Sequence, residues 1–207
     1  MCRKPLSVAT DDERIADAVR SFGGRHAMTS PDCPSGSDRV QEAVRNLECD
    51  VVMNIQGDEP TLPPAALEAL AALMKDHPGL SMGTLVVPVQ SEAEYEDPNV
   101  VKAAVAAGGR CLYFSRSPIP ALAGASFHEA RGSLWRHVGV YAFRKPFLEE
   151  LTKMQPTPLE RLERLEQLRA LELGAEICAA PCPPSGPSVD VPSDVPAVEK
   201  WLLERRP

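Results

Sequence analysis

Two periods of hydrophobic positions alternate along the first half of the chain. Short apolar runs, with the length of strands buried in a sheet, lie at residues 6–10, 25–29, 51–55 and 82–89. Apolar residues that recur every three to four positions, as on one face of a helix, lie at residues 15–22, 40–47 and 67–74. In the first of these helices the spacing places Ile15, Ala18, Val19 and Phe22 on the buried face. Strands that alternate with helices predict an α/β fold with a mostly parallel sheet.

The middle of the chain follows a different pattern. Residues 99–105 and 110–115 flank Ala107-Gly108-Gly109, which is a signature of a β-hairpin. Residues 118–131 begin with two closely spaced prolines and predict an irregular, exposed insertion. Residues 135–143 predict a further strand that carries both basic and aromatic side chains.

The last third of the chain predicts a helix, a strand and a second helix. Thr157-Pro158-Leu159-Glu160 has the form of a capping box with proline at the first helical position, so we expect one helix over residues 157–173. Three polar residues lie off its apolar stripe and are most simply interpreted as solvated: Glu166, Gln167 and Arg169. A strand is expected at residues 176–180, and Ser193 can cap the last helix.

Composition narrows the functional classes. The 207 residues, 43% hydrophobic and 25% charged, predict one soluble domain with a substantial core. A net charge of -7 argues against a general affinity for nucleic acid. No apolar run approaches the ~18 residues of a membrane helix, and no signal peptide is recognisable, so we expect a cytoplasmic protein without membrane contact. The six cysteines form no C-x-x-C pair, which excludes the usual zinc spacing.

Two carboxylates follow the apolar run at residues 51–55. Asp58 and Glu59 come directly after Gly57, where that strand is expected to end. Ligands of α/β proteins bind beyond the carboxyl ends of the strands, and carboxylate oxygens suit a divalent cation. The alternative is a polar turn in which Asp58 caps the next element.

A loop rich in serine and glycine precedes the second helix. Ser35, Gly36 and Ser37 offer hydroxyl and backbone N–H groups at a helix N-terminus, a suitable place for a nucleotide. The alternative is that Ser37 only caps the helix.

Eight groups of motifs, taken in order, resemble one family. They are Val8-Ala9-Thr10-Asp11, Met28-Thr29 with Ser35-Gly36-Ser37-Asp38-Arg39, Asn54-Ile55-Gln56-Gly57-Asp58-Glu59-Pro60, Asp97-Pro98-Asn99-Val100-Val101-Lys102, Leu112-Tyr113-Phe114-Ser115-Arg116 with Ile119-Pro120, Arg136-His137-Val138-Gly139-Val140-Tyr141, Pro158-Leu159-Glu160 to Arg169, and Val189-Asp190-Val191-Pro192. Over essentially the whole chain the sequence resembles the 3-deoxy-manno-octulosonate (Kdo) cytidylyltransferases of lipopolysaccharide synthesis.

The resemblance implies a fold and an activity. The fold is a three-layer, Rossmann-like nucleotidyltransferase sheet with helices on both faces and a small antiparallel lobe. Residues 1–207 would form one cytidylyltransferase-like domain, in which residues from about 90 to 150 make the substrate and dimerisation lobe. The activity is transfer of CMP from CTP to the anomeric hydroxyl of Kdo, with Mg²⁺ as cofactor and a homodimer as the working form.

The resemblance also assigns roles to residues. Asp58 and Asp190 would be the catalytic carboxylates that hold the metal. The nucleotide would be bound by Thr10, Asp11, Ser35, Gly36, Ser37 and Arg39. Kdo would be bound by Gln56, Arg116, His137, Tyr141, Glu166 and Gln167. Arg116 suits the carboxylate of the sugar because a guanidinium binds carboxylates bidentately.

The sequence departs from the family pattern at its N-terminus. The family begins with a strand and a phosphate-gripping loop that have no counterpart here, apart from Arg3-Lys4-Pro5-Leu6. In the family topology that strand lies between those at residues 6–10 and 51–55, so we expect both to lack a ladder partner. Because the loop carries the cations for the β- and γ-phosphates, we expect the 207-residue chain to transfer CMP slowly. In the pocket loop, Cys33 and Pro34 stand where the family has His and usually Gln.

Two other functions remain open from the sequence. One is a non-catalytic homologue that binds a sugar acid or a partner, which the missing phosphate loop would explain. The other is a sialic acid cytidylyltransferase, against which the segments at residues 113–116 and 136–141 argue.

Overall fold

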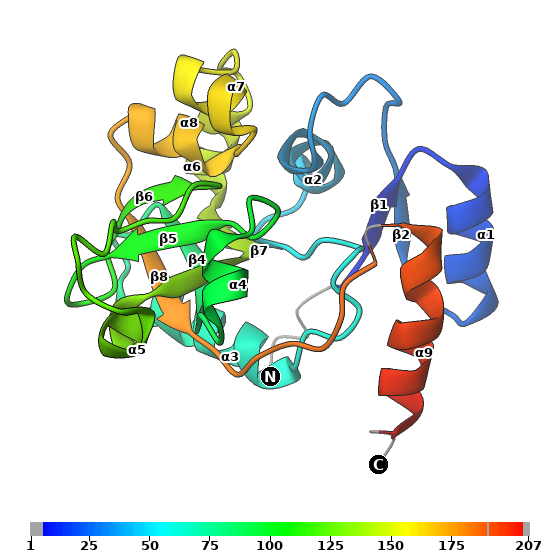
Figure 1. Ribbon diagram of the computed structural model, residues 1–207. Coiled ribbons are helices and arrows are strands. Elements are labelled where there is room, and N and C mark those ends of the chain that lie inside the picture. Colours follow the sequence, from blue (N-terminus) through cyan, green and yellow to red (C-terminus); the bar gives the residue numbers. More distant parts are fainter. Residues whose placement is uncertain (1–5, 190, 205–207) are drawn as a thin grey trace.

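The computed structural model of the protein describes residues 6–189 and 191–204. Figure 1 shows a larger group of elements around a mixed sheet and a smaller group around two short strands. The strands of this part of the chain are β1 (Val8–Thr10), β2 (His26–Met28), β3 (Val51–Asn54), β4 (Met82–Pro88), β5 (Lys102–Val105), β6 (Cys111–Ser115), β7 (Trp135–Arg144) and β8 (Ile177–Pro181). The helices are α1 (Glu13–Ser21), α2 (Gly36–Val44), α3 (Pro64–Asp76), α4 (Glu92–Glu96), α5 (Phe127–Ala130), α6 (Lys145–Leu151), α7 (Pro158–Glu163), α8 (Gln167–Glu172) and α9 (Val195–Glu204), with short 3-10 turns η1 (Arg131–Ser133) and η2 (Pro192–Asp194). Among the described residues, none of the helices is long and apolar enough to cross a membrane.

The larger sheet is organised around β7. Its strand order is β6-β5-β7-β4-β8, and β3 pairs with the C-terminal half of β7, where Val51 lies opposite Arg144. β3 and β4 both run antiparallel to β7, and β8 runs parallel to β4, so β3, β4 and β8 point the same way. The hairpin of β5 and β6 adds the small antiparallel part. The predicted α/β class is therefore confirmed, but the expected mostly parallel pairing is wrong: in the described part of this sheet only β4 and β8 pair in parallel, because β7 runs antiparallel to each strand that it pairs with.

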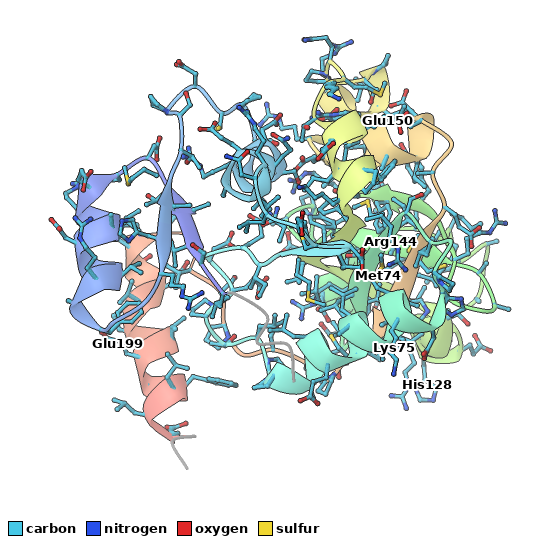
Figure 2. All side chains as sticks on the ribbon, turned by 180° about the vertical axis from the view of Figure 1, so that it is seen from behind. Met74, Lys75, His128, Arg144, Glu150 and Glu199 are labelled. Carbon is cyan, nitrogen blue, oxygen red and sulfur yellow. The ribbon has the colours of Figure 1, made fainter. Side chains whose placement is uncertain are left out.

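Apolar side chains cover both faces of this sheet. Along β4, Met82 and Val86 join the core beneath α6 and α8, whereas Leu85 and Val87 join the core beneath α3. This alternation follows from the two-residue period of a strand. Arg144 fixes α3 to the sheet, because its NH2 donates to the carbonyl oxygen of Met74 at 2.5 Å, and Figure 2 shows these two residues together. The three-layer arrangement is thus built from one sheet and helices on two sides.

β1 and β3 lie in different sheets. Within the described residues, β1 pairs with β2 alone and β3 with β7 alone, so each has one edge without a strand partner. Helix α2 packs against both strands and joins the two groups of elements (Figure 1). Each of the two strands thus has one edge that no described strand covers.

The predicted buried face of α1 is largely wrong. Only Val19 of the four expected residues is buried, together with Ala16; Ile15 is 46% and Phe22 73% exposed. The cause is the size of the sheet beneath the helix, which has two strands of three residues each. Such a sheet covers a narrow stripe of the helix and leaves the rest of its apolar face in solvent.

The segment at residues 118–131 is more ordered than the sequence indicated. It contains α5, and its Leu122 and Phe127 pack against a small core that includes Tyr95. The hydroxyl group of Tyr95 donates to the carbonyl oxygen of Pro120 at 2.5 Å. The insertion is therefore anchored at two points and not simply exposed.

The expected helix over residues 157–173 is two helices. Arg164 adopts a left-handed conformation with φ of 55° and ends α7, and α8 begins at Gln167 in a new direction. The turn buries Gln167 and Arg169, which the sequence placed in solvent. Arg169 is satisfied there by a bidentate ion pair with Glu160, with nitrogen–oxygen distances of 2.8 and 2.5 Å.

We expect Arg169→Met to lower the free energy of unfolding by at least about 3 kcal/mol, because it leaves the carboxylate of Glu160 buried without its partner. Urea unfolding at pH 7 measures the loss. The double variant Glu160→Leu/Arg169→Met is the control, since it removes both charges and is expected to lose less than the single variant. Equal stability of the single variant and the parent chain would contradict the prediction.

Candidate functional site

The serine and glycine loop begins α2 beside the end of β3. Ser35, not Ser37, is the N-cap, and its hydroxyl oxygen accepts the N–H of Asp38 at 3.2 Å. Ser37 is fully buried and receives a weak hydrogen bond from Asn54 Nδ2 at 3.5 Å. The interpretation of Ser37 as a simple helix cap is therefore wrong. Capping by Ser35 leaves Ser37 to face the interior of the site.

Glu166 links this loop to the start of α8. Its Oε1 lies 3.0 Å from the hydroxyl oxygen of Ser35, and the hydroxyl of Ser37 also hydrogen-bonds to its carboxylate. Burial raises the pKa of Glu166, and the two serine hydroxyls partly oppose that shift. A Cβ on Gly36 would lie 3.8 Å from Gln56 Nε2. Residues predicted for the nucleotide and residues predicted for the sugar therefore meet at one point.

Arg39 connects the loop to the small sheet. Its NH1 donates to Thr29 Oγ1 at 2.7 Å, and its NH2 pairs with the carboxylate of Asp11 at 3.1 Å. Thr10 is buried, and its Oγ1 accepts the N–H of Asp12 at 3.1 Å. In this structure Thr10, Asp11 and Arg39 thus fix the position of the loop between the two groups of elements.

His137 forms one buried wall of the site. Its ring lies 5.0 Å from Phe114 and 5.5 Å from Tyr141, measured between ring centroids. Thr84 Oγ1 lies 2.9 Å from both the carbonyl oxygen of Val140 and His137 Nε2 and can donate its one hydrogen to either of them. Nε2 is thus engaged by Thr84 as donor or as acceptor, and Nδ1 takes the opposite role. Burial lowers the pKa of His137 to about 3, so the ring stays neutral at physiological pH.

Tyr141 and Gln167 complete that wall. The hydroxyl group of Tyr141 donates to Gln167 Oε1 at 3.0 Å, and burial raises the pKa of the phenol. Gln167 is 2% exposed, yet within the described chain its Nε2 has no hydrogen-bond partner. An unsatisfied buried donor costs about 1–3 kcal/mol. A ligand oxygen at this place would remove that cost.

Arg116 follows directly after β6 and is half-buried. Its Nε donates to the carbonyl oxygen of Glu163 at 2.9 Å, and its NH1 donates to that of Pro98 at 3.3 Å. In residues 6–189 and 191–204 its guanidinium forms no ion pair with a carboxylate. The remaining N–H groups suit an anionic ligand.

Asp58 lies in the turn after β3 and is exposed. Its carbonyl oxygen accepts the N–H of Val189 at 2.9 Å, so the segment near residue 189 reaches the end of β3. Asp190, the second expected metal ligand, lies outside the described residues. Among the residues that are described, no group of three His, Cys, Asp or Glu side chains is arranged to hold a metal. The Asp58 carboxylate still fits Mg²⁺, which takes one or two carboxylates together with phosphate oxygens and waters.

Two charged residues next to Arg116, the first buried and the second half-buried, were given no role in the sequence analysis. They are Lys102 and Glu163. The sequence did set Lys102 apart, since it is the only charged residue in the apolar run from Val100 to Val105. Nothing set Glu163 apart, because one acidic residue in a charged helix is ordinary.

We expect acid to destabilise the protein through His137. The unfolded chain binds a proton on this residue below pH 6.5 and the folded chain only below about pH 3, so stability falls as the pH drops between these values. The contribution amounts to about 2 kcal/mol between pH 7 and pH 4.5. Guanidinium unfolding of the parent chain and His137→Gln at both pH values measures it. His128→Gln, at an exposed histidine of α5, should keep the full acid sensitivity. Identical pH dependence of the parent chain and His137→Gln would contradict the assignment.

Known proteins are similar to this chain in sequence and in fold. The sequence profile of the cytidylyltransferase family matches residues 3–177. The 3-deoxy-manno-octulosonate cytidylyltransferase of Syntrophotalea carbinolica is 43% identical over 206 residues, which cover 97% of this chain and 82% of that protein. The 8-amino-3,8-dideoxy-manno-octulosonate cytidylyltransferase of Shewanella halifaxensis is 42% identical over 203 residues, covering 96% and 81%. A solved CMP:2-keto-3-deoxy-manno-octonic acid synthetase in complex with CTP matches with a TM-score of 0.91 and 37% identity, over 98% of this chain and 82% of that chain.

Proposed function

Since the chain belongs to the family of 3-deoxy-manno-octulosonate cytidylyltransferases, we propose that it transfers CMP from CTP to the anomeric hydroxyl of Kdo and releases pyrophosphate. The observation that carries this proposal is the junction at Glu166, where the loop of Ser35 and Ser37 meets the helix that begins with Gln167. Transfer between two substrates requires their sites to adjoin, because most of the catalytic advantage lies in positioning the reacting atoms.

The nucleotide is assigned to the loop at the start of α2. Gly36 and the serine hydroxyls on either side would contact CTP, and Arg39, with Asp11 and Thr10 behind it, would keep the loop in place. The support for this assignment is the fixed geometry of the loop, since Arg39 holds it at 2.7 and 3.1 Å from two sides.

The sugar acid is assigned to the buried wall and to Arg116. Its carboxylate would bind the guanidinium of Arg116. Its hydroxyl groups would hydrogen-bond to Nδ1 of His137 and accept from Nε2 of Gln167, whose N–H group has no partner among the described residues. Gln56, Tyr141 and Glu166 would line the rest of the pocket.

The reaction itself needs little covalent chemistry from the protein. The anomeric oxygen of Kdo forms a bond to the α-phosphorus of CTP, the bond from that phosphorus to the bridging oxygen breaks, and pyrophosphate leaves with the bridging oxygen. The proton of the anomeric hydroxyl passes to the departing pyrophosphate or to water. Asp58 and Asp190 would hold Mg²⁺, which would neutralise phosphate charge when bound. His137 would contribute as a neutral hydrogen-bonding group, since its pKa of about 3 makes it a poor base.

A homodimer that forms through residues 90–150 and works in the cytoplasm is part of the same proposal, and its support is the family resemblance. Light scattering at micromolar concentration tests the dimer. A monomer at every concentration would contradict it.

The substrate is tested by offering the protein several acids with CTP and MgCl2 under single-turnover conditions. We expect Kdo to give CMP-Kdo and pyrophosphate faster than 8-amino-3,8-dideoxy-manno-octulosonate or sialic acid does. A preference for the 8-amino sugar would move the assignment to the activity named for the Shewanella relative. If calorimetry detects Kdo binding but no CMP is transferred, the non-catalytic binding protein is favoured. A preference for sialic acid would overturn the Kdo assignment.

A further inference from the structure

Lys102 is a buried cation at the start of β5. Its side chain is 0% exposed, and the structure records no ion pair for it among the described residues. Its Nζ donates instead to three carbonyl oxygens, those of Asp97 at 2.7 Å, Val100 at 2.5 Å and Arg116 at 2.6 Å. All three hydrogens of the ammonium are therefore used, and one of them fixes the main chain of Arg116.

Glu163 holds the same arginine from the other side. It is the last residue of α7, and its Oε2 accepts the N–H of Arg116 at 2.9 Å. Its Oε1 accepts the hydroxyl of Ser115 at 2.6 Å, and its own carbonyl oxygen accepts Arg116 Nε at 2.9 Å. Side chain and main chain of Glu163 thus both engage Arg116.

Together these contacts fix the direction of the guanidinium. The carbonyl oxygen, the amide N–H and Nε of Arg116 are all occupied by Lys102 or Glu163. NH1 also donates to the carbonyl oxygen of Pro98 at 3.3 Å, so what remains for a ligand is the second N–H of NH1 and the two of NH2. An arginine held in this way loses little side-chain entropy when a carboxylate binds, which is the advantage of preorganisation.

Glu163 also ties Arg116 to the other residues of the sugar pocket. The left-handed turn at Arg164 follows it, and Glu166 and Gln167 come next in the chain. The Glu163 carboxylate therefore connects Ser115 and Arg116, at and just after the end of β6, to the end of α7, from which the turn leads into α8. Displacing it would move both parts of the pocket relative to each other.

We propose that Lys102 and Glu163 are positioning residues that hold Arg116 ready for the carboxylate of the sugar acid. The assignment of that carboxylate to Arg116 rests on the proposed function, whereas the fixing of Arg116 itself does not. The competing explanation is that both residues only stabilise the fold.

The fixing of Arg116 can be measured without any ligand. In ¹⁵N–¹H spectra of the arginine side chains, the Arg116 Nε–H signal, identified by its absence in Arg116→Gln, is expected to exchange slowly with water. Glu163→Gln, which keeps the shape of the side chain, and Lys102→Met are each expected to lose that protection. Lys145→Met is the matched control, because Lys145 Nζ likewise donates to two carbonyl oxygens, of Arg45 and Leu47, in another part of the molecule. Unchanged protection of Arg116 in Glu163→Gln and Lys102→Met would overturn the proposal.

The affinity for Kdo then distinguishes a positioning role of Lys102 and Glu163 from a purely stabilising one. NMR titration is expected to show at least about tenfold weaker binding in Glu163→Gln and Lys102→Met than in the parent chain. In an Arg116→Gln background the same substitutions should have little further effect, because they act through the arginine. An equal loss in both backgrounds would overturn the proposal. A parent chain with a protected Arg116 signal that binds no Kdo would instead overturn the proposed substrate.

Discussion

Asp58→Asn is expected to lower the transfer of CMP to Kdo by at least about 10³-fold without unfolding the protein. The side chain is exposed in the turn after β3, so the loss of one charge should cost little stability. The amide keeps the size of the carboxylate but is a much weaker ligand for Mg²⁺. The effect is measured as pyrophosphate release with the protein in excess, over a series of MgCl2 concentrations.

Asp50→Asn is the matched control for this substitution. Asp50 is also exposed and precedes the same strand at its other end, so its variant changes the net charge equally and should keep the parent rate. Asp190→Asn should behave like Asp58→Asn if the two carboxylates act on one ion. A parent rate in Asp58→Asn at every magnesium concentration would remove this residue from the site.

The order of elements was predictable because it depends on local patterns. The apolar runs gave β1, β3 and β4 close to their observed bounds, and the glycine pair at Gly108 and Gly109, both with φ near 90°, turned the hairpin as expected. The break at Arg164 was not predictable in the same way. A capping box marks where a helix begins, and no residue after it signals a left-handed turn, which is rare outside glycine and asparagine.

The sequence did not show which charged residues are buried in the folded chain. Arg169 has the appearance of a solvated helix residue, and it is buried because Glu160, nine positions earlier, meets it after the chain turns. Lys102 is buried because three carbonyl oxygens converge on it, which depends on the meeting of separate segments. The expected set of site residues did include Ser35, Glu166, Tyr141 and Gln167, and the structure brings these together in pairs, although their roles stay predictions.

A gain of at least about 10³-fold in turnover is expected when a strand and a phosphate-gripping loop of the kind that the family resemblance implies are fused ahead of Leu6. In the part of the chain that the structure describes, β1 and β3 each have an edge without a strand partner, and an added strand can pair with such edges through its main chain. The loop would bring the arginine and lysine side chains that neutralise the β- and γ-phosphates. Removal of a single donor from a preorganised anion site costs about 10²–10³ in rate, so several cations together justify the expected size.

The fusion has a control that separates its two effects. A second fusion in which the arginines and lysines of the loop are replaced by glutamine keeps the strand and loses the charges. Both fusions should unfold at higher urea concentration than the 207-residue chain, because both cover the edges of β1 and β3. Only the first should gain turnover. Equal rates of the two fusions would show that the cations are dispensable, and a 207-residue chain as fast as the first fusion would show that this chain already neutralises the phosphates without that loop.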